Sequence, residues 1–175
     1  MIPAKFDYTK PGSLDEAVGA LAGGGEDAKV IAGGQSLLPL LRLRLSFPDL
    51  LVDVGGLGEL RGVRDEGETL WIGALTTIDE AQRDPVLAQH CGLLAQTAEL
   101  IADPAVRHRG TIGGALAHAD PAGDLPAVAT ALDATMIARG PGGERAIGAG
   151  EFFLDYLTTA LAPHIDSLIC FPIKC

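Results

Sequence analysis

Two short glycine-rich motifs contain the residues best suited to binding chemistry. The first is Ala32-Gly33-Gly34-Gln35-Ser36, which follows the apolar run Val30-Ile31. The second is Thr111-Ile112-Gly113-Gly114, which follows Arg107 to Gly110. We expect each motif to close a strand-like run. Paired glycines keep side chains away from the backbone, so that successive N–H groups can converge on one anion. Two such motifs predict a ligand with two phosphates, a dinucleotide such as FAD.

Charged residues near the motifs bear on the kind of ligand. Arg42 and Arg44 follow the first motif, and Arg107 and Arg109 precede the second, so both have positive charge nearby. The alternative interpretation is that each arginine is a solvated surface charge. The whole chain has a net charge of −10 and no basic stripe, which argues against a nucleic-acid partner.

The chain lacks the residue patterns that disulfide, metal or catalytic sites require. Cys91, Cys170 and Cys175 show no C-x-x-C spacing, so we predict no disulfide framework, no metal site and no iron–sulfur cluster in this chain. This cysteine usage favours the reducing cytoplasm. No acid–base pair or nucleophile stands out, so no catalytic residue is assigned. The leucine-rich run 37–45 is too short and too charged to span a bilayer, and the N-terminus contains no secretory signal.

The elements around the first motif follow an α/β pattern. Ser13 and Glu16 form a capping box that begins a helix, and Gly23 to Gly25 end it. The apolar pattern then predicts a strand over 29–32, a helix over 37–45 and a strand over 50–54. Ser36 is expected to cap the second helix. This order predicts a small parallel α/β lobe over residues 1–55.

The rest of the chain, 56–175, is expected to form a second, mixed α+β lobe beyond a glycine hinge over 55–58. The pattern predicts strands over 62–64 and 69–74, helices over 77–83, 92–102 and from Asp124, a hairpin over 135–139 and 144–148, and a last strand over 167–173. Asp84-Pro85 and Asp103-Pro104 are expected to stop helices. Trp71 is expected in the core.

Two longer segments resemble one protein family. They are AGGQSLLPLLRLRL over 32–45 and IADPAVRHRGTIGGALAHADPAGDLPA over 101–127. They are similar to the FAD-binding (medium) subunit of molybdenum hydroxylases, a family that includes aerobic carbon monoxide dehydrogenase and xanthine dehydrogenase. The resemblance extends from about Ile2 to Thr159. It implies a fold of the vanillyl-alcohol-oxidase type, with two subdomains and FAD between them.

The resemblance also implies which residues contact FAD. Residues 32–36 match the first phosphate-holding loop, where the family often has His in place of Gln35. Residues 111–114 match the second loop, and Ala115 stands where the family commonly has Asn. Asp124 falls where the family has an acidic flavin contact, and the alternative is that Asp124 only caps a helix.

The same resemblance implies a role in a larger enzyme. Family members pass electrons from the iron–sulfur clusters of a small 2Fe-2S subunit, through FAD, to an external acceptor, and a large subunit holds the molybdenum cofactor. The resemblance also leads us to expect that the family's C-terminal domain has no counterpart in this chain. Two alternatives stay open at this stage: a truncated, non-catalytic module that keeps the fold, or a stand-alone flavin enzyme acting on a small molecule.

Overall fold

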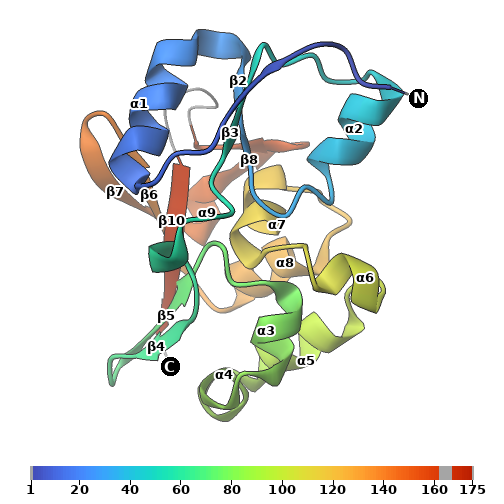
Figure 1. Ribbon diagram of the computed structural model, residues 1–175. Helices are drawn as coiled ribbons and strands as arrows, with labels where there is room; N and C mark the ends of the chain where they lie inside the picture. Colours follow the sequence, from blue (N-terminus) through green and yellow to red (C-terminus); the bar gives the residue numbers. More distant parts are fainter. Residues whose placement is uncertain (1, 162–166, 175) are drawn as a thin grey trace.

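The N-terminal part of the chain is built around a small parallel sheet. The computed structural model describes residues 2–161 and 167–174. Strands β1 (Asp7–Thr9), β3 (Leu50–Asp53) and β2 (Ala28–Ile31) lie in that order, and both pairings are parallel (Figure 1). The predicted parallel arrangement of the strands near residues 29–32 and 50–54 is therefore confirmed. Strand β1 extends it by a strand that the sequence pattern does not indicate.

Helix α1 (Leu14–Gly24) forms as its capping residues predict. The Ser13 hydroxyl oxygen accepts a hydrogen bond from the Glu16 N–H at 3.2 Å, which satisfies one of the free donors of the first turn. The side chains on one face of the helix are buried: Leu14, Ala17, Val18 and Leu21. Gly25, with φ 68°, ends the helix in a conformation that glycine tolerates without strain.

Helix α2 (Leu37–Leu43) follows the first glycine motif and lies beside the N-terminus (Figure 1). Leu41 is its one fully buried residue. Neither of the two apolar cores described below contains a residue of this helix. Across the described residues, no helix has the length and apolarity needed to cross a membrane.

The second sheet is antiparallel. Its order is β4 (Val63–Asp65), β5 (Thr69–Gly73), β10 (Ser167–Lys174), β6 (Thr135–Gly140) and β7 (Gly143–Gly148). The predicted hairpin over 135–148 and the predicted last strand are confirmed. A smaller ribbon pairs β8 (Phe153–Asp155) with β9 (Thr158–Thr159), which the sequence pattern does not indicate.

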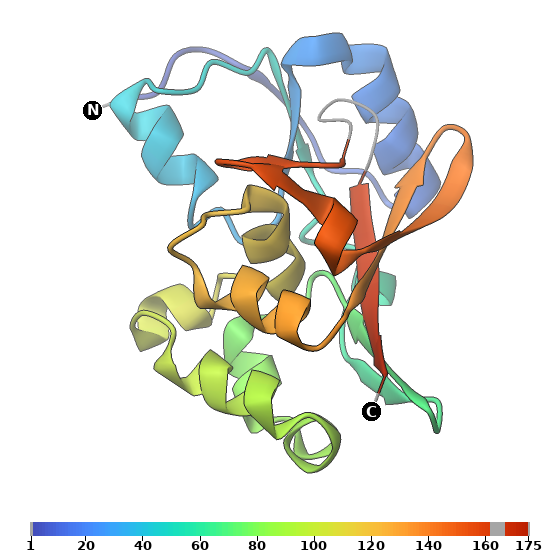
Figure 2. The same cartoon turned by 180° about the vertical axis from the view of Figure 1, so that it is seen from behind.

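A layer of short helices lies to one side of the five-stranded sheet (Figures 1 and 2). These helices are α3 (Ile78–Arg83), α4 (Pro85–His90), α5 (Gly92–Leu100), α6 (Pro104–Arg107), α7 (Ile112–His118) and α8 (Asp124–Ala131), with α9 (Ala149–Phe152) leading into β8. Helix α3 has the complete capping box that Thr77 and Glu80 predict.

The two Asp-Pro pairs do more than end helices. Asp84 accepts from the Leu87 N–H at 2.9 Å, and Asp103 accepts from the Val106 N–H at 2.9 Å. Each proline then occupies the first turn of a new helix, where its missing N–H costs no bond. The prediction of simple stops was incomplete, because each pair begins α4 or α6.

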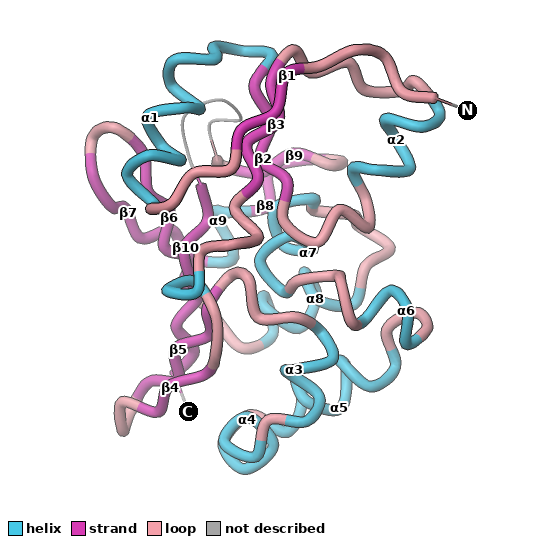
Figure 3. Tube along the Cα trace, viewed as in Figure 1, coloured by secondary structure: helices cyan, strands magenta, loops and turns pink. Residues whose placement is uncertain are grey.

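Two apolar cores hold these layers together, and Figure 3 shows the strands and helices that surround them. The smaller core joins α1 to the parallel sheet and also takes in Leu57, Leu60 and Leu75, which lie beyond residue 55. Two short 3₁₀ helices, η1 (Gly25–Asp27) and η2 (Gly58–Leu60), border it. The boundary between residues 55 and 56 stays a prediction.

The larger core lies between the five-stranded sheet and the helical layer. It contains strand residues such as Ile72 and Met136 and helix residues such as Leu116. Trp71 is only partly buried, so the prediction that it belongs to the core was wrong. The alternation along β5 explains this, since Leu70 and Ile72 face the core and Trp71 points the other way.

Candidate functional site

The first glycine motif contacts the backbone of the segment that comes just before the second motif, about 75 residues further along the chain. A Cβ at residue 33 would lie 2.0 Å from the carbonyl oxygen of Arg109 and 3.0 Å from the Cα of Gly110. Only glycine leaves room for this approach. The predicted proximity of the motifs is therefore a feature of the fold.

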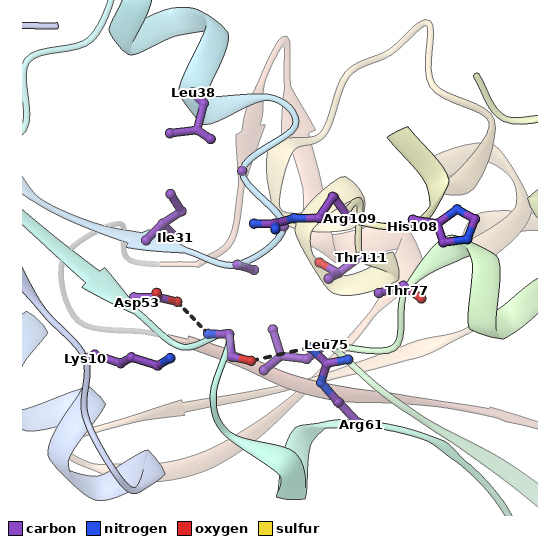
Figure 4. A pocket seen from close by; sticks show the side chains of 14 residues that line it. Lys10, Ile31, Leu38, Asp53, Arg61, Leu75, Thr77, His108, Arg109 and Thr111 are labelled. Carbon is purple, nitrogen blue, oxygen red and sulfur yellow. Dashed lines mark hydrogen bonds between the residues drawn. The ribbon is translucent and has the colours of Figure 1, made fainter. Parts of the chain in front are cut away.

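A pocket of about 310 Å³ opens where the motifs meet (Figure 4). Ala32, Gly33 and Gly34 of the first motif line it, and Thr111 of the second does. The other predicted site residues, Gln35, Ser36, Ile112, Gly113, Gly114 and Asp124, are not among the lining residues. The rest of the wall comes from β2, β3, Leu38 of α2 and the segments before α3 and α7, together with Lys10, Gly55 and Arg61.

The first motif keeps its backbone donors available. None of the hydrogen bonds between described residues uses the N–H of Gly33, Gly34, Gln35 or Ser36. Gly34 has φ 74°, a left-handed conformation that favours glycine and turns the chain out of β2. Gly33 and Gly34 line the pocket, so their N–H groups can serve an anion there.

Ser36 does not cap helix α2 with its side chain. Its backbone already has helical angles, φ −96° and ψ −46°, and no hydrogen bond joins its hydroxyl to the first turn. A capping side chain needs an extended backbone at that position to reach back to the turn. The prediction that Ser36 caps the helix was wrong, and its exposed hydroxyl remains available.

Three of the four backbone N–H groups in the second motif donate to acceptors inside the protein. The N–H of Ile112 donates to Thr76 O at 2.9 Å, and the N–H of Gly113 donates to Ala74 O at 2.9 Å. The N–H of Gly114 donates to the Thr111 hydroxyl oxygen at 3.1 Å. The prediction that these groups converge on an anion was therefore wrong for this motif.

The reason is that the second motif begins helix α7, whereas it was expected to follow a strand. It comes directly after α6, and Thr111 is the cap of α7. A Cβ at residue 113 would lie 2.4 Å from the Cβ of Ala74. Gly113 therefore allows α7 to pack against the segment after β5.

Thr111 still presents one donor to the pocket. Its residue is buried, and its hydroxyl oxygen accepts from Gly114, which leaves the hydroxyl hydrogen to be donated elsewhere. Because Thr111 lines the pocket, this hydrogen is the motif's polar contribution to it.

Three cationic side chains line the pocket: Lys10, Arg61 and Arg109 (Figure 4). Lys10 and Arg109 form no ion pair with any residue in the described part of the chain. Arg61 makes two long contacts of 3.4 Å, to Glu80 Oε1 and to the carbonyl oxygen of Gly55. The pocket is therefore locally positive in a strongly acidic protein.

The sequence pattern singles out only one of these three cations. Arg109 belongs to the arginine cluster next to the second motif. Lys10 and Arg61 reach the pocket from distant segments whose sequence gives no indication of a ligand site. Arg107 does not face the pocket, because its guanidinium donates to the carbonyl oxygens of Ile101 and Ala102 at 3.0 Å. Arg107 is therefore neither a ligand of the pocket nor the solvated surface charge that the alternative interpretation describes.

Asp53 places one carboxylate at the pocket wall, at the carboxyl end of β3. Its Oδ1 accepts from the Gly55 N–H at 2.8 Å, and its Oδ2 accepts from the Tyr8 hydroxyl at 2.5 Å. The hydrogen bond to Asp53 raises the pKa of Tyr8 above its ordinary value of 10. The oriented carboxylate is a suitable acceptor for a sugar hydroxyl.

His108 also lines the pocket, although a lone histidine in the sequence is not enough to predict a functional role. Its Nδ1 lies 2.6 Å from the carbonyl oxygen of Pro104, and its Nε2 lies 3.6 Å from Oδ2 of Asp79. Asp79 is itself held by Arg83 at 2.7 Å. These contacts hold the ring at the C-terminal end of α6.

Asp124 is exposed at the first position of α8. The residue that caps this helix is Gly123, and no side chain makes a capping bond. The alternative that Asp124 is a helix cap was therefore wrong. Its contact with flavin stays a prediction, as do the contacts of the other motif residues.

Comparisons with known proteins agree with one another. The family described as FAD binding domain in molybdopterin dehydrogenase matches residues 4–170. The carbon monoxide dehydrogenase medium chain of Hydrogenophaga pseudoflava is 47% identical over 92% of this chain and 56% of its own length. The 6-hydroxypseudooxynicotine dehydrogenase complex subunit alpha of Paenarthrobacter nicotinovorans is 44% identical over 93% of this chain and 55% of its own length.

Solved structures show the same likeness. A carbon monoxide dehydrogenase from Hydrogenophaga pseudoflava has a chain that superposes with a TM-score of 0.97 at 43% identity, covering 100% of this chain and 61% of that one. Quinoline 2-oxidoreductase from Pseudomonas putida 86 gives 0.96 at 37% identity, covering 99% and 60%. The chain spans little more than half the length of the curated relatives it matches. The predicted cofactor, FAD, and a mixed α/β FAD-binding fold are confirmed.

Proposed function

The chain belongs to the family of FAD-binding domains in molybdopterin dehydrogenases, and we propose that it holds the pyrophosphate of FAD in the pocket between the two glycine motifs. The observation that carries this proposal is that, among the described residues, the N–H groups of Gly33 and Gly34 have no hydrogen-bond partner and lie beside Lys10 and Arg109, which form no ion pair there. Free donors and cations together favour a group with two negative charges.

The remaining predicted residues take different parts in this proposal. Thr111 donates its hydroxyl hydrogen, and Asp53 accepts from a hydroxyl of the ribose or the ribityl chain. Ile112, Gly113 and Gly114 hold Thr111 in place through their internal hydrogen bonds. Asp124 is assigned the contact with the flavin end that the family resemblance implies. No residue is assigned a catalytic role.

The wider role is also a proposal. The chemistry that bound FAD supplies would be the relay of electrons from the iron–sulfur clusters of a small subunit to an external acceptor. Substrate would be oxidised on a large molybdenum-cofactor subunit, so the chain would act only within a complex. Relatives named as medium chains and as a complex subunit support this role. The vanillyl-alcohol-oxidase type of fold, the two-lobe division at residue 55 and a cytoplasmic location belong to the same proposal.

The test is the visible absorption spectrum of the purified chain, recorded before and after addition of FAD and desalting. We expect flavin bands that survive desalting. A chain that stays colourless after FAD addition would contradict the proposed site. Addition of ADP to the FAD-loaded chain should displace flavin if the pocket binds the diphosphate half, and displacement by riboflavin alone would argue against that location.

A further inference from the structure

Arg61 joins two parts of the pocket wall that are far apart in sequence. Its Nη2 donates to the carbonyl oxygen of Gly55, in the turn after β3, at 3.4 Å (Figure 4). Its Nη1 donates to Oε1 of Glu80, in helix α3, also at 3.4 Å. Arg61 itself lines the pocket. The guanidinium therefore lies beside the pocket between the turn and the start of α3.

Both contacts of Arg61 are loose. Charge-assisted hydrogen bonds are normally about 2.7–2.9 Å long, and in this chain Arg83 holds Asp79 at 2.7 Å. The side chains of Arg61 and Glu80 are 41% and 50% exposed, so water competes for their charges. No further hydrogen bond joins the Arg61 side chain to a described residue, which leaves other N–H donors of the guanidinium available. Arg61 can therefore exchange its present acceptors for a ligand at little cost.

Glu80 is held in place independently of Arg61. Its Oε2 accepts from the Thr77 N–H at 2.7 Å and from the Thr77 hydroxyl at 2.9 Å, within the capping box of α3. Thr77 is buried and lines the pocket. The capping box thus fixes one carboxylate oxygen and leaves the other, Oε1, toward Arg61. A carboxylate fixed in this position competes with any anion that approaches the same guanidinium.

We propose that Arg61 is a phosphate-binding residue of the pocket, and that Glu80 is a built-in competitor whose carboxylate a phosphate of the ligand displaces. The inference rests on the proposed function, because the diphosphate of FAD is the anion expected in the pocket. The planar guanidinium presents paired donors that suit phosphate oxygens. Glu80 therefore lowers the affinity of the pocket for its ligand, and Arg61 raises it.

The chain contains a second pair that serves as a matched control. Arg139 in β6 and Glu144 in β7 are joined by a contact of 3.3 Å between Nη1 and Oε1, and both side chains are partly exposed. Neither residue lines the pocket. A general effect of losing a surface ion pair should therefore appear in both pairs, whereas an effect on ligand binding should appear only at Arg61 and Glu80.

The experiment measures FAD affinity by calorimetry for the parent chain and for single variants. Glu80→Gln should raise the affinity about fivefold, the most that an exposed ion pair normally contributes. Glutamine also serves in a capping box, so α3 keeps its start. Arg61→Gln should lower the affinity about tenfold, because a charge-assisted hydrogen bond to the ligand is lost. Glu144→Gln should match the parent.

The double variant Arg61→Gln with Glu80→Gln separates competition for Arg61 from simple repulsion of the ligand. Once Arg61 is replaced, the Glu80 substitution should give almost no further change in FAD affinity. A gain of the same size with and without Arg61 would mean that Glu80 acts through its own charge, and would overturn the proposal. So would a Glu80→Gln chain that binds FAD no more tightly than the parent, or an Arg61→Gln chain that binds it equally well.

Inorganic pyrophosphate, used as a second probe, distinguishes this inference from the proposed function. A set of variants that binds pyrophosphate in the expected order of affinity but does not bind FAD would contradict the proposed function and leave the role of Arg61 and Glu80 standing. FAD binding that none of these substitutions alters would leave the proposed function standing and overturn the inference. A parent chain that binds neither probe would overturn both.

Discussion

The two glycine motifs are alike in sequence and differ in what their backbones do. The first leaves the N–H groups of Gly33 and Gly34 beside the pocket without a hydrogen-bond partner in the described chain, whereas the second uses those of Ile112, Gly113 and Gly114 within the protein. Glycine thus leaves backbone N–H groups accessible to an anion in one motif and allows close packing in the other. The comparison teaches that a Gly-Gly pair near a cofactor does not by itself identify phosphate donors.

The largest effect is expected from Gly113→Ala, which tests the packing role of the second motif. The new Cβ would lie 2.4 Å from Ala74 Cβ and 2.7 Å from its Cα, so one backbone segment would have to move. Overpacking of this kind costs about 3 kcal/mol of unfolding free energy. Urea denaturation measures it. The control is Gly19→Ala in α1, where no atom lies within 4 Å. Equal stability of both variants would contradict the assigned role.

Arg109→Gln tests the anion-binding role of the pocket with a smaller expected effect. A charge-assisted hydrogen bond contributes about 1.5 kcal/mol, so FAD affinity should fall roughly tenfold. Unfolding free energy should barely change, since the guanidinium has no ion pair in the described chain. Fluorescence titration with FAD at two salt concentrations provides the measurement. Unchanged affinity would remove Arg109 from the site.

The serine and threonine at the two helix starts give a sharper contrast. Thr111→Ala removes a real cap of α7 and should cost about 1 kcal/mol of stability. Ser36→Ala removes no cap of α2, so stability should stay the same while FAD affinity falls. Thermal unfolding of the FAD-free proteins, followed by FAD titration, separates the two. The reverse pattern would mean that Ser36 is structural and Thr111 is not.

The smallest effect concerns Tyr8 at the edge of the parallel sheet. Its hydrogen bond to Asp53 raises its pKa, so the bond stabilises the fold below pH 10 and is lost as pH rises through the raised value. Ultraviolet titration of the phenolate should show a late transition that Tyr8→Phe removes and Asp53→Asn moves to lower pH. Because Tyr8 is exposed, the change in stability should be slight. A Tyr8 pKa that stays the same in Asp53→Asn would rule out the bond as its cause.

Local patterns predicted the elements whose stability is local. The capping box at Thr77 and the hairpin over 135–148 depend on neighbours within a few residues, and both formed as predicted. The predicted box at Ser13 formed only in part, because Ser13 caps the helix but the Glu16 side chain accepts from the Gly12 N–H. Helix α7 gave no such signal, because Gly113 and Gly114 lower helix propensity and the helix depends on packing against Ala74.

The site shows the same division between local and distant determinants. The motif residues were identifiable from composition and spacing, whereas Lys10 and Arg61 enter the pocket only through tertiary packing. The acceptors that take up the second motif's donors, Thr76 O and Ala74 O, are backbone atoms with no residue signature. A sequence pattern can show where donors are, but not whether the fold has already used them.

The contact of Gly33 with the Arg109 carbonyl has a kinetic consequence. A bridge between Thr77 and Thr111 also joins two segments that line the pocket, so these parts of the wall are held in place without a ligand. A preorganised site avoids the entropic cost of closing around its ligand. Differences in affinity among variants of this pocket should therefore arise mainly from how fast flavin leaves, and its rate of association should vary little.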